Sequence, residues 1–119
     1  MKKFTFENCR REHNKMWLLL AETGIVHKDS YPELNRIRNE YGRAPSNICF
    51  ACEYTKGKEK RIHCEKCPIA WDGEKCEEFN CENNKGEYKL WMYAHENERK
   101  RLALIIANKK WTDKRKEKP

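Results

Sequence analysis

Four cysteines between residues 47 and 71 have the spacing of a tetrahedral metal site. They form two Cys-x-x-Cys motifs, Cys49 with Cys52 and Cys64 with Cys67, and eleven residues separate the two motifs. Two residues between cysteines allow one tight turn to direct both sulfurs to one point, so two such turns can surround a Zn²⁺ ion. The sequence therefore predicts a tetracysteine site with zinc as the cofactor.

Other cysteine chemistries agree less well with the chain. A thioredoxin-type redox motif requires a βαβ setting that neither motif shows, and the compact cysteine runs of ferredoxins are absent from the sequence. Disulfide frameworks belong to exported proteins, whereas residues 5–15 are polar and the apolar run at 17–21 is too short for a signal peptide or a membrane span. Seven cysteines, an odd number, also favour reduced thiols. We therefore expect a cytoplasmic protein.

The three remaining cysteines have less certain roles. Cys76 is an alternate ligand that could replace one of the four motif cysteines. Together with Cys81 and either His63 or His95 it could instead build a second site, or both could be free thiols. Cys9 is expected to be a small buried or half-exposed thiol.

The elements that must position the metal site are mostly helical. With 38% hydrophobic and 38% charged residues, the core is modest and a structural metal would contribute to the folding free energy. We expect one zinc-stabilised domain of α+β class, in which a zinc-ribbon or treble-clef-like hairpin packs with two N-terminal helices and one long C-terminal helix. The expected bounds are 1–112 for the domain, 8–23, 30–41 and 87–110 for the helices, 47–71 for the zinc hairpin and 113–119 for a basic flexible tail.

Apolar residues at helical spacing predict which faces of these helices are buried. In the first helix, which should end at Gly24, they are His13, Met16, Trp17, Leu20 and Ala21. In the second, opened by a capping box at residues 30–33 and ended by Gly42, they are Leu34, Ile37 and Tyr41. In the C-terminal helix they are Tyr88, Trp91, His95, Leu102, Ile105 and Ile106. Arg36, Arg38 and Arg43 are expected on a solvated face, and Trp71 is expected to cover the metal site.

Basic residues are concentrated toward the end of the chain. The net charge is +7, yet residues 1–98 carry 17 basic and 17 acidic side chains, and the excess lies in residues 99–119. A basic hairpin tip and a basic tail can attract an anionic partner, or can serve only for solubility. The candidate contacts with nucleic acid or another partner are Lys56, Lys58, Lys60, Arg61, Lys109, Lys110, Lys114, Arg115 and Lys116.

Several short motifs occur together between residues 8 and 111. They are His13-x-x-x-Trp17, Cys49-x-x-Cys52-Glu53-Tyr54, Cys64-x-x-Cys67-Pro68-Ile69-x-Trp71, a later Cys76, Tyr88-x-x-Trp91 and Ile106-Ala107-Asn108. This combination resembles small cysteine-rich proteins encoded by bacteriophages and prophages of Firmicutes. The resemblance implies a phage setting and a bound metal, and it implies that Cys76 accompanies the two motifs, but it supplies no activity.

Binding is the function that these observations favour. The four histidines are scattered, no catalytic motif is present, and a closed tetracysteine shell has no open position for water, so we expect no enzyme activity. The prediction is a zinc-binding accessory module that acts on a host or phage protein, for example as an inhibitor of a host enzyme or defence system. The alternative is a nucleic-acid-binding zinc-ribbon protein, a transcription or DNA-metabolism factor, although the acidic stretch at residues 74–98 opposes contact with a phosphate backbone.

Overall fold

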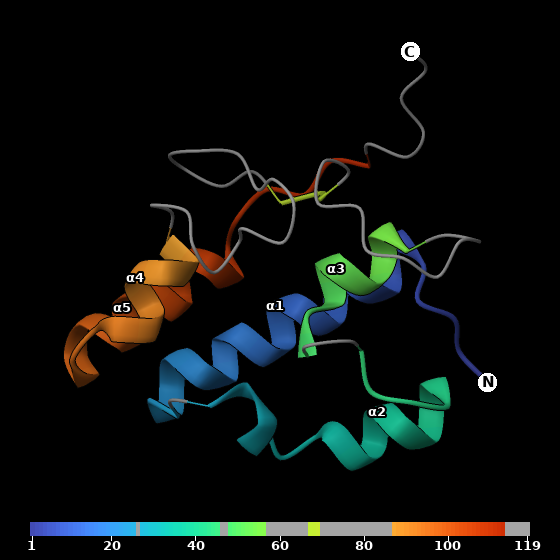
Figure 1. Ribbon diagram of the computed structural model, residues 1–119, viewed down its shortest axis with the longest axis horizontal. Coiled ribbons are helices and arrows are strands. Elements are labelled where there is room, and N and C mark those ends of the chain that lie inside the picture. Colours follow the sequence, from blue (N-terminus) through green and yellow to red (C-terminus); the bar gives the residue numbers. More distant parts are fainter. Residues whose placement is uncertain (26, 46–47, 57–66, 70–86, 114–119) are drawn as a thin grey trace.

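The computed structural model describes residues 1–25, 27–45, 48–56, 67–69 and 87–113 of the chain. Within these segments the protein is mostly helical, with five α-helices and one 3-10 turn, and it contains no strand longer than a single bridge (Figure 1). The elements are α1 (Phe6–Thr23), η1 (Lys28–Ser30), α2 (Leu34–Tyr41), α3 (Phe50–Thr55), α4 (Glu87–Tyr93) and α5 (Glu96–Ala107). None of the described helices combines the length and the hydropathy that a bilayer crossing requires.

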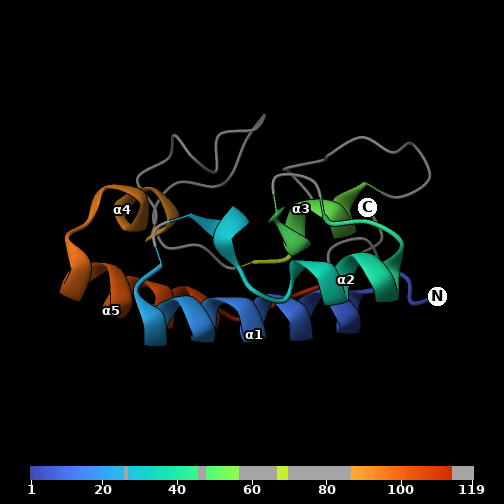
Figure 2. The same cartoon turned by 90° about the horizontal axis from the view of Figure 1, so that it is seen from below.

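Helix α1 is the central element, because α3 and α5 both pack against it (Figures 1 and 2). Its predicted apolar face is confirmed: His13, Met16, Trp17 and Leu20 are buried and Ala21 is half-buried. The helix begins two residues earlier than expected, because the Thr5 hydroxyl accepts a hydrogen bond from the backbone N–H of Asn8 at 3.1 Å. It ends as predicted at Gly24, whose φ of 74° lies in the left-handed region that favours glycine.

The start of the second predicted helix is wrong. Residues 28–30 form the turn η1, and α2 begins only at Leu34, with Glu33 at the N-cap and no side-chain capping bond. The carboxylate of Glu33 instead accepts a hydrogen bond from Arg36 Nε at 2.6 Å, so the expected capping box does not form. The buried face and the stop at Gly42 are as predicted.

Two glutamates that the sequence analysis left unassigned are buried, and each holds an arginine. Glu12 on α1 accepts hydrogen bonds from Arg36 at 2.7 and 3.1 Å and from the Tyr41 hydroxyl at 3.1 Å. Glu53 on α3 accepts two hydrogen bonds from Arg43, at 2.5 and 2.7 Å. The expectation that Arg36 and Arg43 only lie on a solvated face is therefore wrong, because each of them neutralises a buried carboxylate.

The zinc-ribbon hairpin is not shown by the described residues, because the segment that should form its first arm is helical. Helix α3 has Cys49 as its N-cap and buries Phe50 and Tyr54, four residues apart, on one face. The buried residues of α3 include consecutive ones, Glu53, Tyr54 and Thr55, whereas a half-buried strand would alternate its buried side chains. Of the second arm, only residues 67–69 are described, and Ile69 forms an isolated antiparallel bridge with Trp111.

The predicted C-terminal helix is divided into two, since α4 ends at Tyr93 and α5 begins at Glu96. His95 is the extended N-cap residue of α5 and is exposed, so its predicted place on the buried face is wrong. The division lets α4 fold back against α5 (Figure 2) and brings Trp91 onto α1, where its ring contacts Trp17 edge-to-face with centroids 4.8 Å apart. Arg99 secures the connection by donating a hydrogen bond to the carbonyl of Ala94 at 2.8 Å.

Helix α5 supplies the other half of the interface with α1. Leu102, Ala103, Ile106 and Ala107 are buried, and Leu104 is exposed. Together with the apolar faces of α1, α2 and α3 they form the main core of the protein. The side chain of Tyr88 lies outside the described part of the chain.

Candidate metal centre and basic pocket

The structure places Cys67, from the second predicted motif, near Cys49 of the first. Cys49 and Cys52 lie at the start of α3, and Cys67 belongs to a small buried cluster with Ala51 and Ile69, against which Cys49 packs. After the contact with Cys49 and burial, the negative charge of a Cys67 thiolate is a further cause that raises the pKa of Cys52. The predicted residues Cys64, Cys76 and Cys81 lie outside the described residues.

The sulfur of Cys49 is surrounded by hydrogen-bond donors. The backbone N–H of Cys52 donates to Cys49 Sγ at 3.2 Å. A hydrogen bond from the Cys52 thiol and those from backbone N–H groups lower the pKa of Cys49 to about 7, and the same thiol contact raises the pKa of Cys52. Cys49 is therefore the sulfur that more readily becomes a thiolate, and a thiolate is the form that binds metal.

Zinc coordination requires more than the described sulfurs. Within the described segments, no group of three or more His, Cys, Asp or Glu side chains is arranged to hold a metal ion. The donor chemistry suits Zn²⁺, since adjacent cysteine sulfurs supported by backbone N–H groups are its preferred ligands. A complete shell on this scaffold would take Cys49, Cys52 and Cys67 together with Cys64.

Trp111 is the residue that covers the cysteine cluster in the described structure. The predicted cover, Trp71, lies outside the described residues. Trp111 packs against Cys67 and its neighbours, and a hydrogen bond of 2.9 Å from the backbone N–H of Thr112 to the carbonyl of Pro68 holds the two segments side by side. Sequence reasoning missed this role because Trp111 follows the C-terminal helix by a few residues and shows no periodic relation to the motifs.

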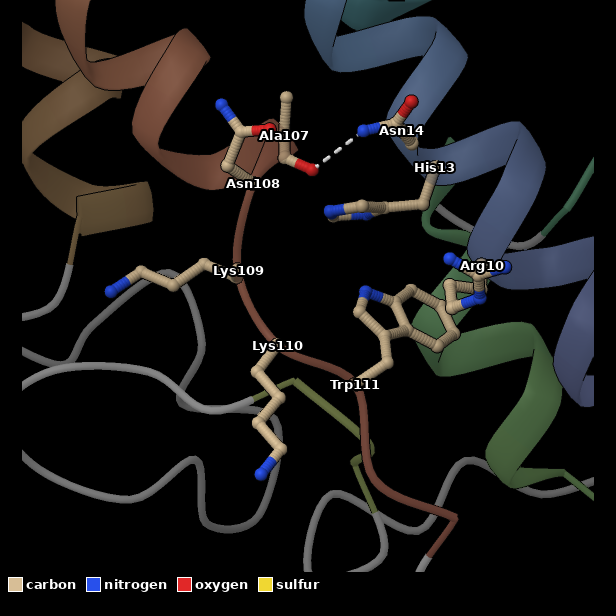
Figure 3. A pocket seen from close by; sticks show the side chains of 8 residues that line it. All are labelled: Arg10, His13, Asn14, Ala107, Asn108, Lys109, Lys110 and Trp111. Carbon is tan, nitrogen blue, oxygen red and sulfur yellow. Dashed lines mark hydrogen bonds between the residues drawn. The ribbon is translucent and has the colours of Figure 1, made fainter.

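Trp111 also lines a pocket of about 360 Å³ between α1 and the end of α5 (Figure 3). Helix α1 contributes Arg10, His13 and Asn14, and the chain that leaves α5 contributes residues 107–111. The indole N–H of Trp111 has no hydrogen-bond partner among the described residues. In Figure 3 it is directed toward His13, and the two rings meet edge-to-face with centroids 5.1 Å apart, a weak N–H···π geometry.

Two polar side chains of α1 cap the C-terminal end of α5. His13 Nε2 lies 3.0 Å from the carbonyl oxygen of Ile106, and because a carbonyl only accepts, Nε2 carries the proton. Asn14 Nδ2 donates to the carbonyl of Ala107 at 2.9 Å. These bonds satisfy carbonyl groups that have no partner within the helix. Burial lowers the pKa of His13 to about 4, so the imidazole is neutral at neutral pH.

The predicted basic contacts divide into three groups. Lys109 and Lys110 line the pocket together with Arg10. Sequence reasoning missed Arg10 because it is on α1, far from the two lysines in the chain. Lys56 forms an ion pair with the buried Glu53 at 3.6 Å. The remaining ones, Lys58, Lys60, Arg61, Lys114, Arg115 and Lys116, lie outside the described residues.

The buried neutral His13 should make stability depend on pH. Between pH 6.5 and about 4 the unfolded chain binds a proton that the folded chain does not, so the free energy of unfolding falls as the pH falls. The slope should approach about 1.4 kcal/mol per pH unit. Urea unfolding at pH values from 7.5 to 4.5 measures it. His13→Gln keeps a donor for Ile106 but does not titrate, so its curve should be flatter, and identical slopes for the two proteins would contradict the assignment.

No protein-family model, curated protein sequence or solved structure matches this chain.

Proposed function

We propose that this protein is a zinc-binding phage accessory protein that acts as a binding module on a host or phage macromolecule in the host cytosol. The observation that carries the zinc part is the position of Cys67. Fourteen residues separate it from Cys52 in the sequence, yet it lies in a small buried cluster against which Cys49, the N-cap residue of α3, packs. Two Cys-x-x-Cys motifs must meet in this way to enclose one ion.

Binding, rather than catalysis, is supported by how the buried titratable groups are used. His13 holds the end of α5 through the carbonyl of Ile106, and Glu12 is neutralised by Arg36 and Tyr41. Both groups therefore hold helices together. The phage setting is what the resemblance of the sequence motifs implies.

Metal analysis of the protein purified without added metal tests this proposal. We expect zinc equimolar with the chain, and chelation should expose the thiols of both motifs to a thiol reagent. Cys9→Ala is the matched control, because Cys9 is a buried thiol of the main core outside the motifs, and this variant should retain its zinc. Protein that contains no zinc, or iron in its place, would refute the zinc proposal.

A further inference from the structure

We propose that the pocket beside Trp111 is a contact site for the phosphodiester backbone of single-stranded nucleic acid. The proposal names the ligand class of the binding module and so rests on the proposed function. Three cationic side chains, Arg10, Lys109 and Lys110, line the pocket, and none of the lining residues in the described part of the chain is a carboxylate. A volume of about 360 Å³ is within the range of about 300 to 1,000 Å³ that is usual for ligand pockets.

Two carboxylates of the described residues lie near the pocket in the sequence, and each has a partner within the protein. Glu7 pairs with Arg10 at 2.9 Å, but both side chains are about half exposed or more, and such pairs contribute little and exchange readily. Asp113 accepts a hydrogen bond of 2.5 Å from the Tyr54 hydroxyl, so one of its carboxylate oxygens already has a partner within the protein. An incoming phosphate can therefore replace Glu7 as the partner of Arg10.

The end of α5 would ordinarily oppose an anion, since a helix C-terminus carries roughly half a negative charge. Here that end is covered. The carbonyl of Ile106 accepts from His13 and from the backbone N–H of Lys109, and the carbonyl of Ala107 accepts from Asn14. Lys109 and Lys110 follow directly after the helix and add positive charge at this end.

The arrangement of the cations distinguishes an extended polyanion from a single small anion. In Figure 3 the side chains of Lys109 and Lys110 extend in different directions from the chain that leaves α5, and Arg10 lies across the pocket on α1. They do not converge on one point, as the ligands of a free phosphate would. Successive phosphates of a strand could each meet one cation, and Trp111, which is half-buried, adds an aromatic ring beside them for contact with a base.

Fluorescence anisotropy of a labelled single-stranded oligonucleotide, with the full zinc-loaded chain, tests this site. The pocket variant is Lys109→Gln with Lys110→Gln. The matched control is Lys15→Gln with Lys100→Gln, which removes the same charge from exposed sites outside the pocket lining. We expect salt-dependent binding by the parent, tenfold or more weaker binding by the pocket variant, and a slope of log K against log salt that is lower by about 1.4, or about 0.7 for each lost phosphate contact. The control should keep the slope of the parent.

Several outcomes would overturn the inference. They are no binding at low salt, equal losses in the pocket variant and the control, full competition by inorganic phosphate at constant ionic strength, or equally tight binding of polyglutamate. The last two would assign the pocket to free phosphate or to acidic peptides. Zinc is measured in the same samples, so zinc-loaded protein that does not bind refutes this inference alone, whereas binding by zinc-free protein refutes the zinc proposal alone.

Discussion

Replacing Cys52 by serine is expected to abolish metal binding and to unfold the protein at 25 °C. Structural zinc sites contribute on the order of 10 kcal/mol or more to folding, which is comparable with the whole stability of a small domain. The loss spreads beyond the site because Phe50 and Tyr54, on the same helix as Cys52, belong to the main core. Circular dichroism during heating, with and without a chelator, measures the effect.

The Cys9→Ala variant is the control for this experiment, since it also removes a buried thiol but leaves both motifs intact. It should lose only the packing of one sulfur atom and should still melt at a lower temperature after chelation. If parent and Cys52→Ser proteins melt at the same temperature and neither responds to the chelator, the metal has no structural role.

Replacing Arg36 by methionine is expected to destabilise the fold by about 3 to 5 kcal/mol at neutral pH, as breaking a buried ion pair does. The side chain of Glu12 is only 3% exposed, and among the described residues the Tyr41 hydroxyl would be its remaining hydrogen-bond partner. Burial raises the pKa of Glu12, but hydrogen bonds from Arg36 hold it below its ordinary value in the parent. Urea unfolding at pH 7 measures the loss.

The pH dependence of this loss separates the charge effect from simple packing. Without Arg36 the folded-state pKa of Glu12 rises above its value in the unfolded chain, so protonation favours the folded variant and the deficit shrinks between pH 7 and pH 5. The double variant Glu12→Gln, Arg36→Met should recover part of the stability. Arg38→Met is the control, since Arg38 is exposed and bonds only Asn35 among the described residues, and it should change the free energy of unfolding by less than about 0.5 kcal/mol. A deficit that stays constant with pH would contradict the buried-charge explanation.

The parts of the fold that the sequence predicts well are those with local causes. The face of α1 follows from the spacing of Met16, Trp17 and Leu20, and Gly24 and Gly42 end their helices because each adopts a positive φ. The break before α5 also had a local signal that was missed, since Glu96 and Glu98 are acidic residues of the kind that favour a first helical turn.

The features that escaped prediction depend on residues far apart in the sequence. Nothing next to Glu12 indicates that Arg36 on another helix neutralises it. Likewise, the pocket exists only because α1 meets the chain after α5, so neither Arg10 nor Trp111 stands out alone. Metal-ligand spacing is itself a long-range pattern, so the meeting of the two cysteine motifs could be predicted from the sequence and stays a prediction.

The hydrogen bond from His13 to Ile106 joins residues 93 positions apart, and this separation has a consequence for folding kinetics. Closing a loop of that length has an entropic cost whose length-dependent part is on the order of 4 kcal/mol. Contacts of α1 with α3 span a shorter loop and can form earlier. During synthesis the apolar face of α1 must therefore stay partly uncovered until α5 leaves the ribosome, which makes the nascent chain dependent on rapid completion or on a chaperone.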